Sequence, residues 1–177
     1  MQTRSMTKKV NNNNFEITEK KTKNGQWMRG KMTYYHGEIY EGEWKHEFPE
    51  GEGKMIFKTG NIYEGEFRNG LMKGKGKMTY KNGDVYEGDW INNCYNGKGK
   101  MTYKNGDIYE GEWRWRTKHG TGKMTYNNGE IYDGRWCQDI ISGYGKMTFR
   151  NGDFYQGWWS NGKIENTTTV EALKKYM

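Results

Sequence analysis

A period of 23 residues governs most of this sequence. The period is visible in the second glycine of a Gly-x-Gly pair, and the aromatic residue that closes each unit keeps the same spacing. The glycines are Gly30, Gly53, Gly76, Gly99, Gly122 and Gly145, and the aromatic residues are Trp44, Phe67, Trp90, Trp113, Trp136 and Trp159. A fixed period of this length is typical of stacked-repeat proteins, in which one repeat alone cannot bury its apolar face. The sequence therefore predicts six copies of one small unit.

Each unit is predicted to be a β-hairpin. In the third unit, residues 77–80 and 85–90 alternate polar and apolar side chains, which is the period of a strand. Asn82-Gly83 stands between the two segments, and Asn-Gly is a strong signal for a tight hairpin turn with positive φ at the glycine. The repeating unit is therefore interpreted as strand, turn, strand.

The faces of the hairpin favour one of two registers. A two-residue loop would place Tyr86 and Trp90 on the same face as Lys77. A three-residue loop instead pairs Met78 with Tyr86 and Lys77 with Glu87, which separates an aromatic face from a charged face. We prefer the second register because it buries one face and forms cross-strand ion pairs on the other.

A row of aromatic residues and glycines is expected to form the core of the sheet. A glycine weakens a strand unless something packs closely over it, so repeated glycines between the rings predict hollows filled by neighbouring rings. The predicted structural row is Tyr40, Gly42, Trp44, Tyr63, Gly65, Phe67, Tyr86, Gly88, Trp90, Tyr109, Gly111, Trp113, Tyr132, Gly134, Trp136, Tyr155, Gly157 and Trp159. The composition agrees, because 16% of the residues are aromatic but only 32% are hydrophobic.

The chain divides into four predicted regions. Residues 1–14 are polar and Asn-rich and are expected to be a disordered basic leader. Residues 15–29 are expected to form a degenerate N-terminal capping strand, and residues 160–177 a C-terminal tail with a short capping helix over 170–176. Between them, 30–159 form the array. Its six repeats are 30–52, 53–75, 76–98, 99–121, 122–144 and 145–159.

Six-residue connections are expected between successive hairpins. They are residues 45–50, 68–73, 91–96, 114–119 and 137–142. Their residue types vary while the hairpins stay similar, so a function that distinguishes this protein would most naturally lie there. The predicted fold is all-β: an elongated single-layer antiparallel sheet of about six stacked β-hairpins, twisted into a trough, with the short C-terminal helix.

The net charge of +7 is concentrated before the array. Residues 1–29 hold seven basic and two acidic residues, whereas 30–159 hold 19 basic and 18 acidic residues. The nearly neutral array disfavours nucleic acid as a partner, because stacking of bases on rings needs a basic groove beside them. The basic arm could instead contact anionic lipid. Its candidate lipid-contacting residues are Lys8, Lys9, Lys20, Lys21, Lys23 and Arg29.

Little in the sequence indicates chemistry. Gly-Lys-Gly-Lys at residues 74–77 lacks the spacing of a phosphate-binding loop, and the histidines are isolated. The sequence therefore predicts no enzyme, no catalytic residue, no metal, no cofactor and no small-molecule substrate. No apolar run is long enough to span a membrane, no secretory signal is present, and Cys94 and Cys137 occupy different repeat positions. We expect an intracellular, cytoplasmic protein that could associate peripherally with membranes.

The unit resembles the MORN (membrane occupation and recognition nexus) repeat. The segments Tyr40-Glu41-Gly42-Glu43-Trp44 and Tyr109-Glu110-Gly111-Glu112-Trp113 match the core of the family pattern. The departures are mild: Phe67 replaces Trp in the second unit, and Met28 replaces the first glycine of the first pair. The resemblance implies an elongated sheet of hairpins and two candidate roles.

The first role implied by the resemblance is a non-catalytic scaffold for protein–protein interaction or self-association, with a protein partner or a homo-oligomer as the result. The alternative is peripheral binding to anionic membrane phospholipids such as phosphoinositides, with the basic arm as an electrostatic tether.

Overall fold

The computed structural model describes residues 6–10, 13–21, 27–46 and 48–165, and all regular elements in these ranges are β-strands. The chain folds as two compact units, each of which holds several of the repeats. The strands of the first unit, Met1–Cys94, are β1 (Met6–Val10), β2 (Asn13–Lys21), β3 (Trp27–Thr33), β4 (Ile39–Lys45), β5 (Phe48–Ile56), β6 (Ile62–Arg68), β7 (Leu71–Thr79) and β8 (Val85–Ile91). The second unit, Tyr95–Met177, holds β9 (Cys94–Thr102, which begins at the boundary), β10 (Ile108–Arg114), β11 (Thr117–Thr125), β12 (Ile131–Cys137), β13 (Ile140–Thr148), β14 (Phe154–Ser160) and β15 (Lys163–Ile164).

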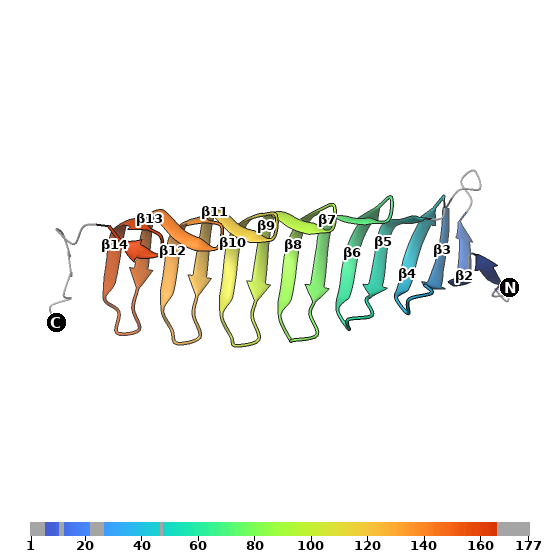
Figure 1. The fold of residues 1–177 in the computed structure, drawn as a ribbon, viewed down its shortest axis with the longest axis horizontal. Coiled ribbons are helices and arrows are strands. Elements are labelled where there is room, and N and C mark those ends of the chain that lie inside the picture. Colours follow the sequence, from blue (N-terminus) through green and yellow to red (C-terminus); the bar gives the residue numbers. More distant parts are fainter. Residues whose placement is uncertain (1–5, 11–12, 22–26, 47, 166–177) are drawn as a thin grey trace. The chain divides into compact units, whose positions relative to one another are not determined.

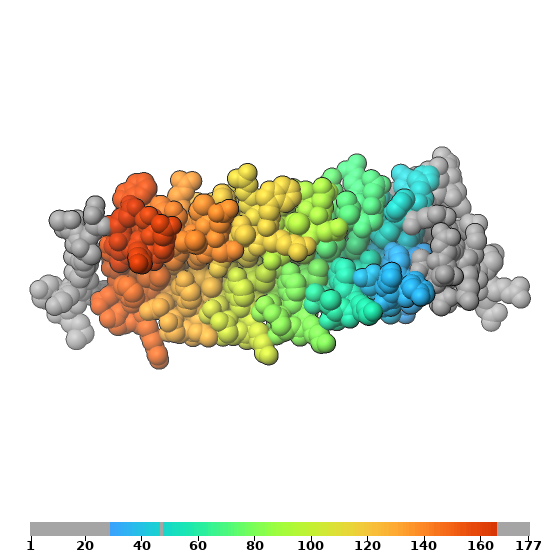
Figure 2. Space-filling model, viewed as in Figure 1, coloured from blue at the N-terminus to red at the C-terminus, as the bar shows by residue number. Residues whose placement is uncertain are grey.

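Within each unit, every strand pairs antiparallel with the next strand along the chain, as the ribbon of Figure 1 shows. The predicted all-β architecture of stacked hairpins is confirmed. Side chains fill the space between the ribbons on the face that Figure 2 shows. The predicted helix at 170–176 lies outside the described residues.

The three-residue loop predicted for the hairpins is confirmed. Met78 pairs with Tyr86 and Lys77 with Glu87. The Tyr80 N–H donates to the Asp84 carbonyl at 2.9 Å, and the Gly83 N–H donates to the Tyr80 carbonyl at 3.0 Å. The turns at Gly37, Gly60, Gly106, Gly129 and Gly152 repeat these two bonds, so a glycine at the same place sets the register of each of these hairpins.

The core of each unit is a row of aromatic rings on one face of the sheet. In the first unit, Tyr63 is fully buried and its ring meets Phe67 on its own strand at 5.1 Å and Trp90 on the next hairpin at 5.0 Å, both edge to face. Tyr109 makes the same two contacts in the second unit, with Trp113 at 4.9 Å and Trp136 at 5.4 Å. Tyr63 and Tyr109 therefore each join two successive repeats.

The glycines make room for these tyrosines. The ring of Tyr63 lies across Gly65 on β6 and Gly76 on β7, and a Cβ added at Gly76 would overlap the Tyr63 hydroxyl. That hydroxyl donates to the carbonyl of Glu66 at 3.0 Å. Because a β-bulge at Glu66 removes this carbonyl from the ladder, the tyrosine satisfies a group that the bulge would otherwise leave unpaired.

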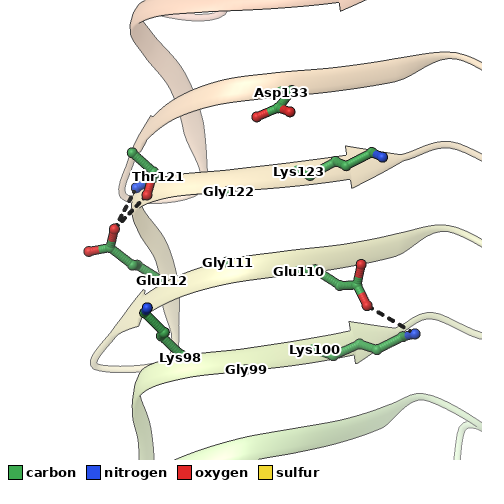
Figure 3. Close-up of a pocket in the computed structure, with 10 residues that line it drawn as sticks. All are labelled: Lys98, Gly99, Lys100, Glu110, Gly111, Glu112, Thr121, Gly122, Lys123 and Asp133. Carbon is green, nitrogen blue, oxygen red and sulfur yellow. Dashed lines mark hydrogen bonds and ion pairs between the residues drawn. The ribbon is translucent and has the colours of Figure 1, made fainter.

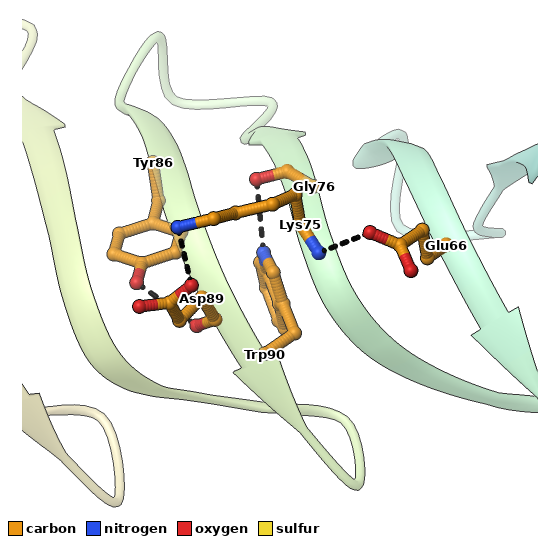
Figure 4. A network of polar contacts seen from close by, with 6 residues as sticks. All are labelled: Glu66, Lys75, Gly76, Tyr86, Asp89 and Trp90. Carbon is orange, nitrogen blue, oxygen red and sulfur yellow. Dashed lines mark hydrogen bonds and ion pairs between the residues drawn. The ribbon is translucent and has the colours of Figure 1, made fainter.

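The tryptophan that closes a hairpin makes a second repeated bond. The indole Nε1–H of Trp90 donates to the carbonyl of Gly76 at 3.0 Å, fourteen residues earlier in the sequence (Figure 4). Trp44, Trp113, Trp136 and Trp159 make the equivalent bond to the glycine of their own repeats. The ring of Phe67 has no N–H, so its repeat lacks this hydrogen bond.

The prediction of six-residue connections between successive hairpins is wrong. Each hairpin strand continues through most of that segment, and only two residues form the turn. The turn pairs with two positive φ angles are Asn69-Gly70, Asn92-Asn93, Trp115-Arg116, Gln138-Asp139 and Asn161-Gly162. Two consecutive positive φ angles are the requirement of a type I′ turn, which matches the twist of the flanking strands. The variable residues are therefore largely strand residues.

The N-terminal segment also differs from the expectation. Residues 6–10 form strand β1 and residues 13–14 begin β2, within the segment where the sequence indicated a disordered leader. β2 pairs with both β1 and β3, so the segment 15–18 is not the last strand at that edge.

Candidate binding surface

The face opposite the rings carries two rows of side chains, one on each side of the central glycines. The constant row lies nearer the three-residue loops. It consists of Lys31, Glu41, Lys54, Glu64, Lys77 and Glu87 in the first unit, and Lys100, Glu110, Lys123, Asp133, Lys146 and Gln156 in the second. Ion pairs form within it, at 3.0 Å between Lys54 and Glu64 and at 3.1 Å between Lys100 and Glu110.

The variable row lies nearer the two-residue turns. It consists of Arg29, Glu43, Glu52, Glu66, Lys75 and Asp89 in the first unit, and Lys98, Glu112, Thr121, Arg135, Tyr144 and Trp158 in the second. The constant row repeats nearly the same alternation of charge. The side chains of the variable row change from repeat to repeat, so this row is the part of the face that distinguishes one repeat from another.

A hollow of about 490 Å³ opens on this face in the second unit. Gly99, Gly111 and Gly122 line its middle, and the two rows form its sides (Figure 3). The side chains around it are Lys98, Lys100, Glu110, Glu112, Thr121, Lys123 and Asp133. Both signs of charge are present, so the hollow suits a polar segment with both kinds of charge better than an anion alone.

Glu112 is held in place at the edge of this hollow. Its carboxylate accepts the hydroxyl of Thr121 at 2.6 Å and the backbone N–H of Thr121 at 3.1 Å. These two bonds, the hydroxyl first, lower the pKa of Glu112 below its usual range, with smaller help from Lys98. The carboxylate is therefore a fixed negative charge near neutral pH.

In the first unit, Glu66 accepts a backbone N–H in the same way as Glu112 does, and more carboxylates surround it. The Glu66 carboxylate accepts the backbone N–H of Lys75 at 2.8 Å, and the Lys75 Nζ lies 2.5 Å from Asp89 (Figure 4). Glu52 stands directly opposite Glu66 on the neighbouring strand, and Glu43 is the variable-row residue of β4. Like charges placed opposite each other destabilise a sheet. Glu43, Glu52 and Glu66 thus lie on three successive strands of the first unit, with Arg29 opposite Glu43.

The last repeat replaces charge by aromatic rings. Tyr144 pairs with Trp158, where β7 and β8 place Lys75 opposite Asp89, and the two rings meet edge to face at 5.8 Å. They are 47% and 60% exposed, in contrast to the buried rings of the core. Sequence reasoning missed this pair, although aligning the repeats at the 23-residue step would have found it.

A second missed residue is Lys118, which lies on the aromatic face. Its Nζ is 4.8 Å from the ring of Trp136 and 5.7 Å from that of Tyr109, a cation–π geometry. Burial lowers the pKa of Lys118, although Asp139 acts in the opposite direction. The equivalent residues Met72 and Ile141 are apolar, so the signal was again in the repeat alignment.

The structure places the predicted structural row, Tyr40 to Trp159, on the aromatic face, where its rings are buried. Of the predicted basic arm, Lys8 and Lys9 lie on β1, Lys20 and Lys21 on β2, and Arg29 on β3, while Lys23 lies outside the described residues. The five described arm residues therefore belong to neighbouring strands at one end of the first unit.

The described residues offer no site of two other kinds. No group of three His, Cys, Asp or Glu side chains there gathers closely enough to hold a metal ion. No helix in that part of the chain has the length and hydropathy of a membrane span.

Comparison with known families gives a clear match. The MORN repeat model matches five consecutive segments, residues 40–62, 63–85, 86–108, 109–131 and 132–154. A search of the curated proteins gives no match.

Solved structures with low sequence identity resemble the chain. The SAS-4 (dCPAP) TCP domain of Drosophila melanogaster, solved with a proline-rich motif of Ana2 (dSTIL), is 16% identical with a TM-score of 0.48, covering 82% of this chain and 78% of that one. The TCP10 domain of Danio rerio CPAP is 10% identical with a TM-score of 0.48, covering 82% and 68%.

Proposed function

The chain belongs to the MORN repeat family, and we propose that it is a non-catalytic scaffold that binds another protein, or a second copy of itself, through the polar face of its sheet. The observation that carries the proposal is the variable row. Its side chains change along the array from three neighbouring carboxylates in the first unit to two exposed rings in the second. In a repeat protein, residues that vary between otherwise constant repeats give the binding surface its specificity for a partner.

The chemistry of the two units supports a polypeptide ligand. Glu43, Glu52 and Glu66 suit basic side chains, whereas Tyr144 and Trp158 suit apolar ones. Exposed Tyr and Trp are enriched where proteins bind each other because they bury much area at small cost in side-chain entropy. Both cysteines are free, which fits the intracellular, cytoplasmic setting that we propose.

The test examines the carboxylates and the exposed rings of the variable row separately. One variant replaces Glu43, Glu52 and Glu66 by Gln, and a matched control replaces Glu41, Glu64 and Glu87 of the constant row, which removes the same charge from the same unit. A third variant replaces Tyr144 and Trp158 by Ser. Self-association is measured by light scattering, and partners recovered with the full chain are then titrated calorimetrically. We expect the first or third variant to lose binding and the control to keep it.

Two results would contradict the proposal. One is a strictly monomeric protein that recovers no partner. The other is a partner whose affinity is the same for all three variants, because the polar face would then not be the surface that it contacts.

The alternative function is peripheral binding to anionic membrane phospholipids, including phosphoinositides. The supporting observation is that Lys8, Lys9, Lys20 and Lys21 lie on the paired strands β1 and β2, which brings them to one end of the first unit. Each lysine near an anionic surface contributes roughly 1 kcal/mol. Replacing these four lysines by Gln should abolish flotation with phosphoinositide-containing liposomes, and unchanged flotation would refute the electrostatic account.

A further inference from the structure

The amine of Lys118, on β11, lies among three aromatic rings of the second unit. Its Nζ is 4.8 Å from the centre of the Trp136 ring, 5.7 Å from that of Tyr109 and 5.8 Å from that of Tyr103. An ammonium within about 6 Å of a ring centre is attracted by the quadrupole of the ring. The three rings therefore form a niche that suits a cation, which we call the ring niche.

Two of these rings are fixed by hydrogen bonds of their own. The Tyr109 hydroxyl donates to the carbonyl of Glu112 at 3.0 Å, and the Trp136 Nε1–H donates to the carbonyl of Gly122 at 3.0 Å. Both side chains are also buried. Their polar atoms are thus engaged with the backbone, and what they offer to Lys118 is ring surface.

Among the described residues, the Lys118 amine has no hydrogen bond and no ion pair. The two carboxylates whose charge acts on it belong to Asp139 and Asp107. Each accepts a backbone N–H instead, that of Lys118 itself at 2.9 Å and that of Asn127 at 2.8 Å. These carboxylates favour a positive charge in the ring niche, but the N–H donors of the amine lack an acceptor there.

Other repeats fill the equivalent position with apolar or aromatic side chains. At the 23-residue step these are Pro49, Met72, Tyr95 and Ile141. The ring of Tyr95 meets the ring of Trp113 at 5.0 Å, just as the Lys118 amine meets Trp136. The position therefore suits a weakly hydrated group, whereas an ammonium with three N–H donors is strongly hydrated.

A methylated ammonium matches the ring niche better than the unmodified amine does. Methylation keeps the positive charge that the rings and the two carboxylates favour. It also replaces N–H donors that lack an acceptor by methyl groups that contact the rings. Acylation would remove the charge and with it the attraction to the rings.

We propose that Lys118 is a site of N-methylation, and that its methylated side chain occupies the ring niche of Tyr103, Tyr109 and Trp136. The methyl donor is a sulfonium compound, and a separate enzyme carries out the transfer. The lone pair of the neutral amine bonds to the methyl carbon, and the carbon–sulfur bond breaks with its electron pair on sulfur. The positive charge passes from sulfur to nitrogen, and each further round first releases one proton to solvent.

Two features of Lys118 make this transfer feasible. Burial lowers its pKa, so more of the amine has a free lone pair. Lys118 is only half-buried and closely follows the exposed turn Trp115-Arg116, so its flexible stem can carry the amine into solvent. The modification does not depend on the scaffold function.

The first test compares methylated and unmethylated side chains at this position in the full chain. With Cys94→Ser and Cys137→Ser, the variant Lys118→Cys has a single thiol. Alkylation in urea with bromoethylamine, or with its trimethylammonium counterpart, gives two lysine analogues that differ only in methylation. After refolding, urea titration should show a folded-to-unfolded ratio about fivefold higher for the trimethylated analogue.

The same pair of analogues at Lys123→Cys is the matched control, because Lys123 lies on the same strand but on the polar face. Methylation there should leave the unfolding equilibrium unchanged. Adding Tyr103→Leu removes one ring and should reduce the difference at Lys118→Cys. Equal stability of the two analogues at Lys118→Cys, or the same difference at Lys123→Cys, would overturn the proposal.

A second test needs no refolding. Peptide mass spectrometry compares Lys118 with Lys123 in the full chain isolated from the cells that produce it naturally. Lys118 should carry added methyl groups and Lys123 should not. A chain that is unmodified at Lys118, or equally methylated at both lysines, would contradict the assignment.

Discussion

At the scale of single residues, each repeat depends on two polar groups attached to apolar rings. The tyrosine hydroxyl satisfies a carbonyl at a bulge, and the indole N–H satisfies the carbonyl of a glycine. A buried carbonyl without a partner costs about 1–3 kcal/mol, so the rings contribute hydrogen bonds as well as apolar area. Phenylalanine or leucine would supply the area alone.

The position of Phe67 tests the value of the indole bond. Replacing Phe67 by Trp should raise the free energy of unfolding by about 0.5–1.5 kcal/mol, because five other repeats already hold a Trp there with its N–H bonded to a glycine carbonyl. Trp90→Phe should lower it by a similar amount. Urea titrations measure both changes. A loss of stability in both variants would show that the fit of each ring to its own site, not the hydrogen bond, decides stability here.

Replacing Lys118 by an apolar residue should stabilise the aromatic core. Its amine is partly desolvated among rings, and burial lowers its pKa. Lys118→Met copies Met72 of an earlier repeat and should raise the unfolding free energy by about 1 kcal/mol at neutral pH. The gain should shrink as pH rises toward about 10.4, where the lysine of the wild-type unfolded state also loses its charge. A destabilised Lys118→Met would mean that the cation–π contacts outweigh desolvation.

At the scale of elements, the hairpins are joined by turns of unequal quality. Asn69-Gly70 and Asn161-Gly162 have the residues that type I′ turns favour. Trp115-Arg116 adopts the same positive φ angles, 49° and 69°, with two bulky residues, and Trp115 is 58% exposed. Positive φ costs roughly 1–2 kcal/mol for such residues. Backbone pairing of β10 with β11 must therefore hold this turn in place.

Replacing Trp115-Arg116 by Asn-Gly should relieve that strain. We expect a gain of about 1 kcal/mol or more in unfolding free energy, measured by urea denaturation, after allowing for the entropy of the added glycine. The reciprocal control, Asn69-Gly70 to Trp-Arg, should lose a similar amount. If the first variant loses partner binding while gaining stability, the strained Trp115 has a role in recognition.

At the scale of the whole molecule, stability within each unit is a sum over neighbouring repeats. Its largest pH-sensitive component is the row of buried tyrosines. Burial raises the pKa of Tyr132 to about 12 and also raises those of Tyr40, Tyr63 and Tyr109. These residues extend over both units, so a change that ionises tyrosine acts on the entire array.

Alkaline pH should therefore unfold the protein. The folded pKa of these tyrosines lies above the unfolded value of about 10, so their contribution is complete below pH 10 and is lost as pH rises from there toward the folded pKa. In that window each tyrosine removes about 1.4 kcal/mol per pH unit. Urea midpoints at about pH 9 and about pH 11 measure the loss. Equal midpoints, with tyrosinate absorbance already present in the folded protein, would contradict it.

Much of the architecture follows from the sequence alone. The 23-residue step predicts the number of hairpins, and the pairing of Met78 with Tyr86 follows from the requirement that one face be apolar. These predictions succeed because hairpin register is local: three residues of turn and the alternation on either side decide it.

The remaining features required the tertiary structure. The bulge at Glu66, the ring of Tyr63 over Gly76 and the indole bond of Trp90 join residues on different strands, and no local pattern specifies such contacts. The two-residue turn at Trp115-Arg116 has no turn-forming residue and is held by its neighbours, whereas Asn69-Gly70 and Asn161-Gly162 carried a local signal at the same repeat position that the sequence analysis did not use. The exposed Tyr144–Trp158 pair becomes a candidate site only once the strands are placed side by side, because the exposure of a side chain is a property of the assembled sheet.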